Sequence, residues 1–363
     1  MKAPDSTPTR QENAVRVDAL LQANPTSGRE RAREIEAAGF DGAWSGEMNH
    51  DPFLPLVKAA EATERIALGT NIAVAFARSP MTTAHVAWDL QLLAGGRFIL
   101  GLGSQIKAHI VRRFSMPWSR PAARMQEYIE ALHAIWDTWE TGDRLDFRGD
   151  FYQHTYTSPL FCPARLESDR PKVYLAAVGP LMTQVAGRVA DGLHCHSFTT
   201  ADYLREVTVP ALRSGEADAG RPARSTAISL PVITVVGETQ EEFDQRSLSA
   251  RLRIAFYGST PAYRGVLEHH GWGEAQTELR DLSLQGRWEE MAGVIDDEML
   301  REIAVVGTNA EVADLLTSRY GAMVDRLTPV ITHDDPSGET AHDPGVESRL
   351  LASLRRSHSP ERH

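Results

Sequence analysis

The sequence predicts an α/β fold, a TIM (β/α)8 barrel with insertions at its mouth. Two observations lead to this prediction. Short apolar segments of strand character alternate with segments of helical character, and eight such strands can be counted with mostly short connections. The chain has 363 residues, of which 42% are hydrophobic, so it can bury one large α/β core. A doubly wound open sheet shows the same alternation, so both architectures fit the pattern.

Each strand is recognised as an apolar run bounded by Gly, Pro or polar residues. The eight expected strands are Val15–Leu21, Gly42–Ser45, Ile66–Phe76, Arg97–Leu102, Lys172–Ala177, Gly192–His196, Ile228–Val236 and Ile303–Val306. The expected helices are Thr26–Ala38, Pro55–Thr63, Thr82–Leu93, Pro121–Trp139, Leu181–Ala190, one beginning near Gln240, and Ala310–Arg319. The first helix has Thr26 or Ser27 as its cap and Gly39 as its stop.

The alternating pattern forms a single domain over residues 15–332. Residues 1–14 are polar and are expected to be a disordered lead, and residues 333–363 are expected to be a flexible tail with a short helix at Val346–Arg356. Two insertions, at about 141–170 and 257–300, exceed a minimal barrel. The first predicts a hairpin that turns at Gly149 and Asp150, and the second is helical. In a barrel, both are expected at or near the mouth, where loops set substrate choice.

Composition excludes several classes of protein. The net charge of −11 argues against a general nucleic-acid surface. No apolar run has the length of a membrane span, and the N-terminal residues lack the apolar core of a secretory signal. The chain contains two cysteines, Cys162 and Cys195, which is too few for a disulfide framework and is typical of a reducing cytoplasm. We therefore expect a cytoplasmic protein that binds neither nucleic acid nor membrane.

The third strand carries an unusual interruption. Gly69, Thr70 and Asn71 lie in the middle of an otherwise apolar run that resumes at Ile72. Gly and Asn tolerate unusual backbone geometry, so the interruption indicates a bulge or a close approach of the backbone to a ligand.

The ends of the second and fourth strands offer polar groups where barrel enzymes gather their chemistry. Glu47 and His50 follow the second strand and could serve as acid or base, although the same segment also suits the cap of the next helix. The fourth strand ends in Gly-x-Gly followed by Gln105. The third glycine of a dinucleotide fingerprint is missing there, so a Rossmann site is disfavoured.

The fifth and sixth strands add two further candidates. Small residues run from Ala176 to Gly179 and lead to Pro180, and such a turn before a helix can bind an anion through backbone N–H groups or be a plain tight turn. On the sixth strand, His194 and His196 share one face while Cys195 lies on the other. A zinc site is disfavoured because no second ligand cluster has matching spacing, and Cys195 could equally be an inert buried thiol.

Other candidates have simpler interpretations. His85, His109 and His133 are isolated and are expected to be structural more often than catalytic. The segment 112–118 is both basic and aromatic, so it could be a lid, a subunit contact or a loop packed on the long helix.

Taken in order, four segments resemble the bacterial luciferase-like monooxygenase superfamily, and in particular its branch that uses the deazaflavin coenzyme F420. They are Glu34–Gly46, Leu68–Pro80, Gly95–Ser104 and Val173–Gly192, and the resemblance covers about Val15 to Val330. The order and spacing of the four segments carry the resemblance.

The resemblance implies a TIM barrel with a flavin or deazaflavin across the strand ends and a homodimeric assembly. It implies a non-prolyl cis peptide in the third strand, at Asn71–Ile72, behind the ring system. It also implies a phosphate-binding turn at Ala176, Ala177, Val178 and Gly179, and a cofactor-side residue at Cys195. Where sugar-phosphate dehydrogenases of this branch often have Asp-His, this chain has Glu47 and Met48, and Gln105 to Lys107 occupy the region of a missing acidic residue.

Three functions are therefore considered. The first is an F420-dependent oxidoreductase that moves a hydride between the coenzyme and a small organic substrate, with Glu47 as the first candidate acid or base, His50 and His109 behind it, and Asn71 and Gln105 as polar contacts. The second is an FMN-dependent monooxygenase that uses O2 and a flavin reductase partner. The third is a relative that binds a flavin or another ligand without catalysis.

Overall fold

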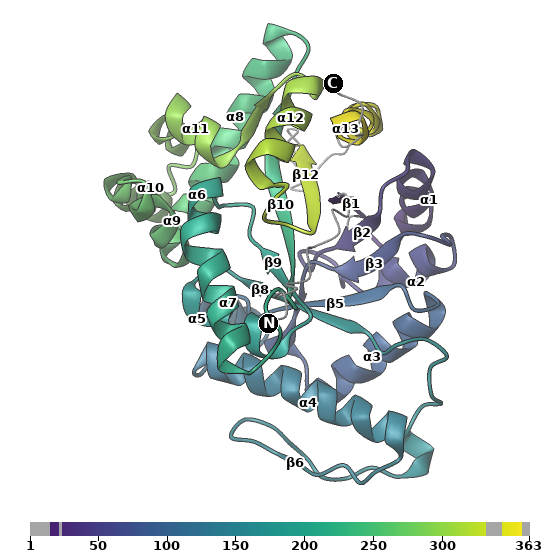
Figure 1. Ribbon diagram of the computed structural model, residues 1–363. Coiled ribbons are helices and arrows are strands. Elements are labelled where there is room, and N and C mark those ends of the chain that lie inside the picture. Colours follow the sequence, from purple (N-terminus) through teal and green to yellow (C-terminus); the bar gives the residue numbers. More distant parts are fainter. Residues whose placement is uncertain (1–14, 22–23, 332–342, 358–363) are drawn as a thin grey trace, which may run out of the picture.

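The computed structural model describes residues 15–21, 24–331 and 343–357, and within them eight parallel strands close into a barrel (Figure 1). The strands around the barrel are β1 (Arg16–Leu20), β2 (Gly42–Ser45), β3 (Ala67–Thr70), β5 (Phe98–Gly103), β8 (Lys172–Ala177), β9 (Gly192–Cys195), β10 (Ala227–Val236) and β12 (Arg326–Ile331). The ring closes where Arg16 and Val17 pair with Arg326 and Leu327. The predicted TIM barrel is confirmed.

The closing strand is not the one expected from the sequence. Residues around Ile303–Val306 form β11 (Val305–Gly307), which pairs with the far end of β10 and lies outside the ring. The ring is closed by β12, whose Pro329 is unusual in a central strand. Pro329 is tolerated because β12 pairs with β1 only at its first two residues, so no partner on that side needs the missing N–H.

Helices surround the barrel. The longer ones are α1 (Gly28–Ala38), α3 (Pro80–Leu93), α4 (Pro121–Thr141), α5 (Pro180–Val189), α7 (Val209–Asp218), α8 (Gln240–Gly258), α10 (Gly273–Leu284), α12 (Asn309–Tyr320) and α13 (Pro344–Ser357). The shorter ones are α2 (Leu54–Ala60), α6 (Ala201–Tyr203), α9 (Arg264–His269) and α11 (Asp297–Ile303). Reciprocal capping boxes fix the starts of α8 and α12, at Thr239 with Glu242 and at Thr308 with Glu311.

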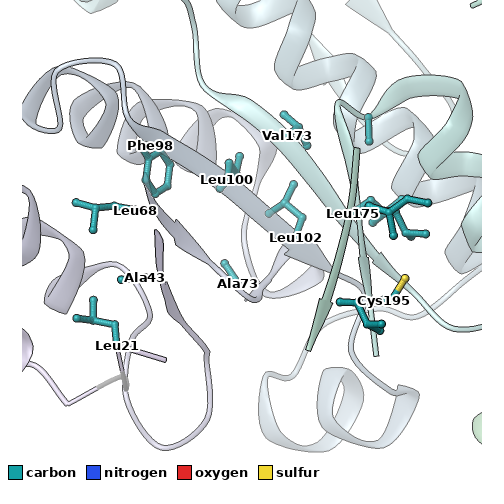
Figure 2. Close-up of a cluster of buried hydrophobic side chains, with 14 of the residues drawn as sticks. Leu21, Ala43, Leu68, Ala73, Phe98, Leu100, Leu102, Val173, Leu175 and Cys195 are labelled. Carbon is teal, nitrogen blue, oxygen red and sulfur yellow. The ribbon is translucent and has the colours of Figure 1, made fainter. Parts of the chain in front are cut away.

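The core has two parts, an outer layer between the strands and the helices and a smaller cluster inside the barrel. Outward-facing side chains of the strands, such as Leu68, Leu100 and Leu175, pack beneath the helices (Figure 2). Inside the barrel, Trp44 packs with Ile99 and Tyr174.

A buried ion pair ties the first strand to the last inside the barrel. Arg326 donates through Nε and Nη2 to the two carboxylate oxygens of Asp18 at 2.7 and 2.6 Å. The indole N–H of Trp44 donates to the same carboxylate at 2.9 Å. Because both ions are fully buried, their mutual pairing is what makes the burial tolerable.

The two insertions occupy different places. The first forms the expected hairpin, with β6 (Phe147–Arg148) and β7 (Gln153–His154) joined by a turn that includes Gly149 and Asp150. This hairpin lies along the outside of α4, where Glu127 accepts the N–H groups of its turn (Figure 1). The second insertion holds α9, α10 and α11, which share a separate apolar core with α8. The second contributes Tyr257, Ala262 and Tyr263 to the cavity at the mouth of the barrel, and none of residues 141–170 lines that cavity.

The expectation of a flexible tail over 333–363 is wrong for its middle part. α13 packs through Val346, Leu350, Leu351 and Leu354 beside β1 and β12. Arg31 of α1 anchors it by pairing with Glu347 at 2.7 Å. The short helix expected at Val346–Arg356 is present within α13, and what was not expected is that its apolar side chains are buried. Residues 1–14, 332–342 and 358–363, on which the remaining expectations fall, lie outside the described residues.

Candidate active site

A cavity of about 540 Å³ opens at the carboxyl ends of the barrel strands. Its wall is built mainly from the segments that follow β2, β3, β5, β8 and β9. Arg253 and Tyr257 of α8, and Ala262 and Tyr263 just after that helix, add to it. This is the face on which (β/α)8 barrels carry their chemistry, and the volume lies within the roughly 300–1,000 Å³ typical of ligand sites.

The predicted bulge in the third strand is confirmed. β3 ends at Thr70, a cis peptide joins Asn71 to Ile72, and the strand resumes as β4 (Ala73–Val74). Both Asn71 and Ile72 line the cavity. Ile72 lies directly over Gly103, where a Cβ atom would come within 2.7 Å of its side chain, so the glycine at the end of β5 makes room for the bulge.

Glu47 lines the cavity, but its carboxylate is engaged by the bulge. Its Oε2 accepts the N–H of Val74 at 2.7 Å and a guanidinium N–H of Arg78 at 2.6 Å. The backbone N–H of Glu47 also donates to the carbonyl of Ile72 at 3.0 Å. Arg78 is held in turn by Asp51 at 3.1 Å. These contacts make Glu47 the anchor of the bulge from the side of β2.

The two histidine candidates lie away from the cavity. His50 is exposed in the segment after β2, and His109 begins a π-helical turn, η2 (His109–Arg113), after β5. Neither contributes to the cavity wall. Gln105 does line it, with a φ of 57°, and its side-chain oxygen accepts the N–H of Ile106 at 2.9 Å.

The turn between β8 and α5 forms another part of the wall. Ala176, Ala177, Val178 and Gly179 line the cavity, while Pro180 takes the first position of α5 and is exposed. No side chain caps this helix, and a Cβ built on Gly179 would meet nothing within 4 Å. The first N–H groups of a helix have no partner within it, so this open end can receive an anion.

On β9, His194 and His196 share one face and Cys195 lies on the other, as predicted. Cys195 is buried in the outer apolar layer (Figure 2), which raises the pKa of its thiol to about 12. It also belongs to the cavity lining, so its expected place on the cofactor's side stays a prediction. His194 points into the barrel beside Trp44 and Tyr174. Burial, assisted by Arg326 and opposed by the Thr70 backbone, lowers the pKa of His194 to about 3.

His196 is the cavity's most defined hydrogen-bonding group. Its Nδ1 accepts the N–H of Phe198 at 3.0 Å, and burial lowers its pKa to about 4. The ring is therefore neutral at pH 7 with its proton on Nε2, which makes it a hydrogen-bond donor and not a general acid. Tyr257 and Tyr263 hold the ring, with centroids at 4.5 and 4.6 Å.

Arg253, Tyr257 and Tyr263 complete the wall and were not predicted from the sequence. Arg253 and Tyr257 stand one turn apart on α8, so they share a helix face. In the sequence, only this spacing and their place in a segment rich in Trp, His and Arg mark them. Neither feature indicates a particular chemistry.

Metal ligands do not gather here. Within the described ranges, no group of three or more His, Cys, Asp and Glu side chains has a metal-binding arrangement. In the same part of the chain, none of the helices is both long and apolar enough to cross a bilayer.

Comparison with protein families matches the chain over residues 5–326 to a family described as luciferase-like monooxygenase. An uncharacterized protein of Mycobacterium tuberculosis is 48% identical over 316 residues, which is 87% of this chain and 93% of that protein. The 5,10-methylenetetrahydromethanopterin reductase of Methanopyrus kandleri is 27% identical over 334 residues, covering 86% of this chain and 90% of the reductase.

Solved structures show the same fold. The coenzyme F420 dependent tetrahydromethanopterin reductase of Methanopyrus kandleri superposes with a TM-score of 0.76 at 21% identity, over 96% of this chain and 100% of that one. A Baeyer-Villiger monooxygenase component of Pseudomonas putida, in complex with FMN, superposes with a TM-score of 0.65 at 15% identity, over 94% and 97% of the two chains.

Proposed function

This chain belongs to the luciferase-like monooxygenase family, an oxidoreductase family, and we propose that it transfers a hydride between coenzyme F420 and a small organic substrate. The F420-dependent reductase above covers 96% of this chain and superposes with a higher TM-score, 0.76, than the FMN-bound monooxygenase at 0.65. The observation that carries the proposal is that one cavity unites the bulge of the third strand with the open N-terminus of α5.

The residues present fit such a cofactor. The cofactor's anionic tail needs donors without a competing protein anion, and the turn Ala176–Gly179 offers backbone N–H groups next to open space. The wall for its flat ring system is the bulge itself, since Gly46 and Gly103 lack the Cβ atoms that would collide with Asn71 and Ile72.

Each part of the wall then has a distinct role. When bound, the deazaflavin supplies hydride chemistry, in which two electrons move together with one hydrogen. The turn before α5 would bind the cofactor's anionic tail, and the bulge would orient its ring system. The ion pair of Glu47 with Arg78 holds the bulge in place. His196 offers its Nε2 proton as a hydrogen bond to a substrate oxygen, where negative charge develops as a hydride arrives.

Fluorescence titration with F420 and with FMN tests the proposal. We expect F420 to bind in the micromolar range or tighter and FMN to bind at least about tenfold more weakly, a difference of 1.4 kcal/mol. Co-purification from a host that makes F420 should give the same ranking. Micromolar binding of FMN alone would favour an FMN-dependent monooxygenase and would contradict the proposal.

A matched pair of glycine variants tests the anion turn. Gly179→Val adds bulk in the open space before α5, at a φ of −86° that any residue adopts, so the fold should tolerate it. Gly293→Val adds the same bulk in open space outside the cavity. We expect the first variant alone to lose F420 affinity, by about tenfold or more. Equal affinity in both variants would show that the turn does not bind the cofactor.

A further inference from the structure

Arg253 is a cation without a partner. It lies on α8, half-buried in the cavity wall, and no residue that the structure describes pairs with its guanidinium. The two preceding arginines on the same helix are engaged: Arg246 donates to the carbonyl of Val236, and Arg251 pairs with Asp297. A guanidinium has five N–H donors, and those of Arg253 are available to an acceptor on a ligand in the cavity.

The charge of the cavity wall also favours an anionic ligand. Among the described residues of its wall, Glu47 is the only carboxylate, and Arg78 already neutralises it at 2.6 Å. Burial keeps His194 and His196 neutral by lowering the pKa of each, to about 3 and about 4. The wall therefore presents one uncompensated positive charge, which favours an anionic ligand.

The surroundings of Arg253 are aromatic. Tyr257 follows it by one helical turn, and Tyr263 packs against Tyr257 with ring centroids 6.0 Å apart. His196 fills the corner between the two rings. Apolar and planar surface thus adjoins the cation, as needed for a ligand with an uncharged flat body and one anionic end.

Arg253 lies across the mouth from the bulge. β3 is the third strand of the ring and β10, which leads into α8, is the seventh, so they stand half a turn of the barrel apart. Figure 1 shows the same separation, with α8 to α11 on the side of the barrel away from α1 to α3. A flat cofactor placed against the bulge would leave its other face toward Arg253, where a substrate must lie.

We propose that Arg253, Tyr257 and Tyr263 form the substrate-recognition wall of this site, and that the substrate is a small organic anion. Its carboxylate or equivalent anionic group pairs with the guanidinium, and its apolar, planar body packs on the two tyrosines. The proposal rests on the proposed function in taking the bulge and the α5 turn as the cofactor's side of the cavity.

Calorimetric titration with two probes tests this assignment. Cinnamate is planar and anionic, and cinnamamide has the same shape without the charge. With the F420-loaded wild-type chain, we expect cinnamate to bind at least about tenfold more tightly than cinnamamide, which corresponds to 1.4 kcal/mol. In Arg253→Gln that ratio should fall to about one, and Arg253→Lys should keep part of it.

Arg280→Gln is the matched control, because Arg280 is exposed on α10, outside the cavity wall, and its loss changes the net charge equally. It should keep the wild-type ratio. An unchanged ratio in Arg253→Gln, or equal binding of both probes by the wild type, would overturn the proposal. Loss of F420 affinity in Arg253→Gln with the probe ratio intact would also overturn it, since the arginine would then serve the cofactor.

The outcome can be separated from the proposed function. If F420 does not bind the wild-type chain, the cofactor assignment fails, and the same two probes titrated into the cofactor-free chain still decide whether Arg253 selects anions. Circular dichroism at increasing temperature checks that Arg253→Gln folds, which we expect because Arg253 has no described partner to lose.

Discussion

Replacing Glu47 by Gln tests whether its carboxylate holds the bulge of the third strand. The side chains of Glu47 and Arg78 are 6% and 17% exposed, so water can replace little of what is lost. Gln has the same shape and keeps an acceptor oxygen, but it turns two charge-assisted hydrogen bonds, from Val74 and from Arg78, into neutral ones.

The magnitude follows from these two bonds. A hydrogen bond to a charged group contributes about 1.5–3 kcal/mol and a neutral one about 0.5–1.5 kcal/mol, so each conversion costs roughly 1 kcal/mol. Asp51 keeps Arg78 partly paired, at 3.1 Å. We expect the free energy of unfolding to fall by about 1.5–2.5 kcal/mol. With an unfolding entropy of about 2.1 cal/mol/K per residue, this lowers Tm by about 2 to 3 °C for a chain of this size.

Thermal and urea unfolding measure the effect, and Glu61→Gln is its control. Glu61 pairs with Arg29 at the surface, where the side chains are 51% and 37% exposed, so that variant should change stability by less than about 0.5 kcal/mol. A double-mutant cycle with Arg78→Gln should give a coupling above about 1 kcal/mol. A loss in Glu47→Gln no larger than in Glu61→Gln, or a coupling near zero, would refute the anchoring role.

Three further predictions follow from burial. Because burial lowers the pKa of His194 to about 3, the unfolded chain binds a proton below about pH 6.5 that the folded chain does not. The free energy of unfolding should therefore fall by up to about 1.4 kcal/mol per pH unit as the pH drops from about 6.5. Urea unfolding of His194→Asn should show a shallower fall, and an equal fall would contradict the prediction. Leu354→Ala should destabilise by about 2–5 kcal/mol if α13 belongs to the barrel, whereas Leu160→Ala, at an 86% exposed position, should cost almost nothing by the same measurement. Cys195, with a pKa raised to about 12, should stay unreactive toward a thiol reagent in the native protein, so that native Cys162→Ser shows no reactive thiol and the denatured variant shows one; a thiol that reacts before denaturation would contradict the burial of Cys195.

The sequence allowed the barrel to be predicted because most of its strands are locally self-evident. Runs such as Lys172–Ala177 are apolar, short and bounded by turn residues, and the structure has the same bounds. β12 was missed because a charged residue, Arg326, and a proline, Pro329, are both unusual in a buried strand. Its stability comes from Asp18, 308 residues away, and no local pattern can contain such a partner.

The site was predictable where backbone geometry dictates the residue type. Gly69, Asn71 and the small residues before α5 indicated the bulge and the turn, and both line the cavity. The catalytic candidates could not be ranked from sequence, because the role of a polar side chain depends on its partners. Glu47 is adjacent to the cavity but engaged by Arg78, and His196 gains its defined proton position from Phe198.

The ion pair between Asp18 and Arg326 has a consequence for synthesis in the cell. At about 5–20 residues per second, roughly 15 to 60 s separate the translation of the aspartate from that of its partner 308 residues later. Through that interval the growing chain holds an unpaired carboxylate and an open strand edge at β1, which invites wrong pairing. Release of β12 from the ribosome therefore determines when the barrel can close.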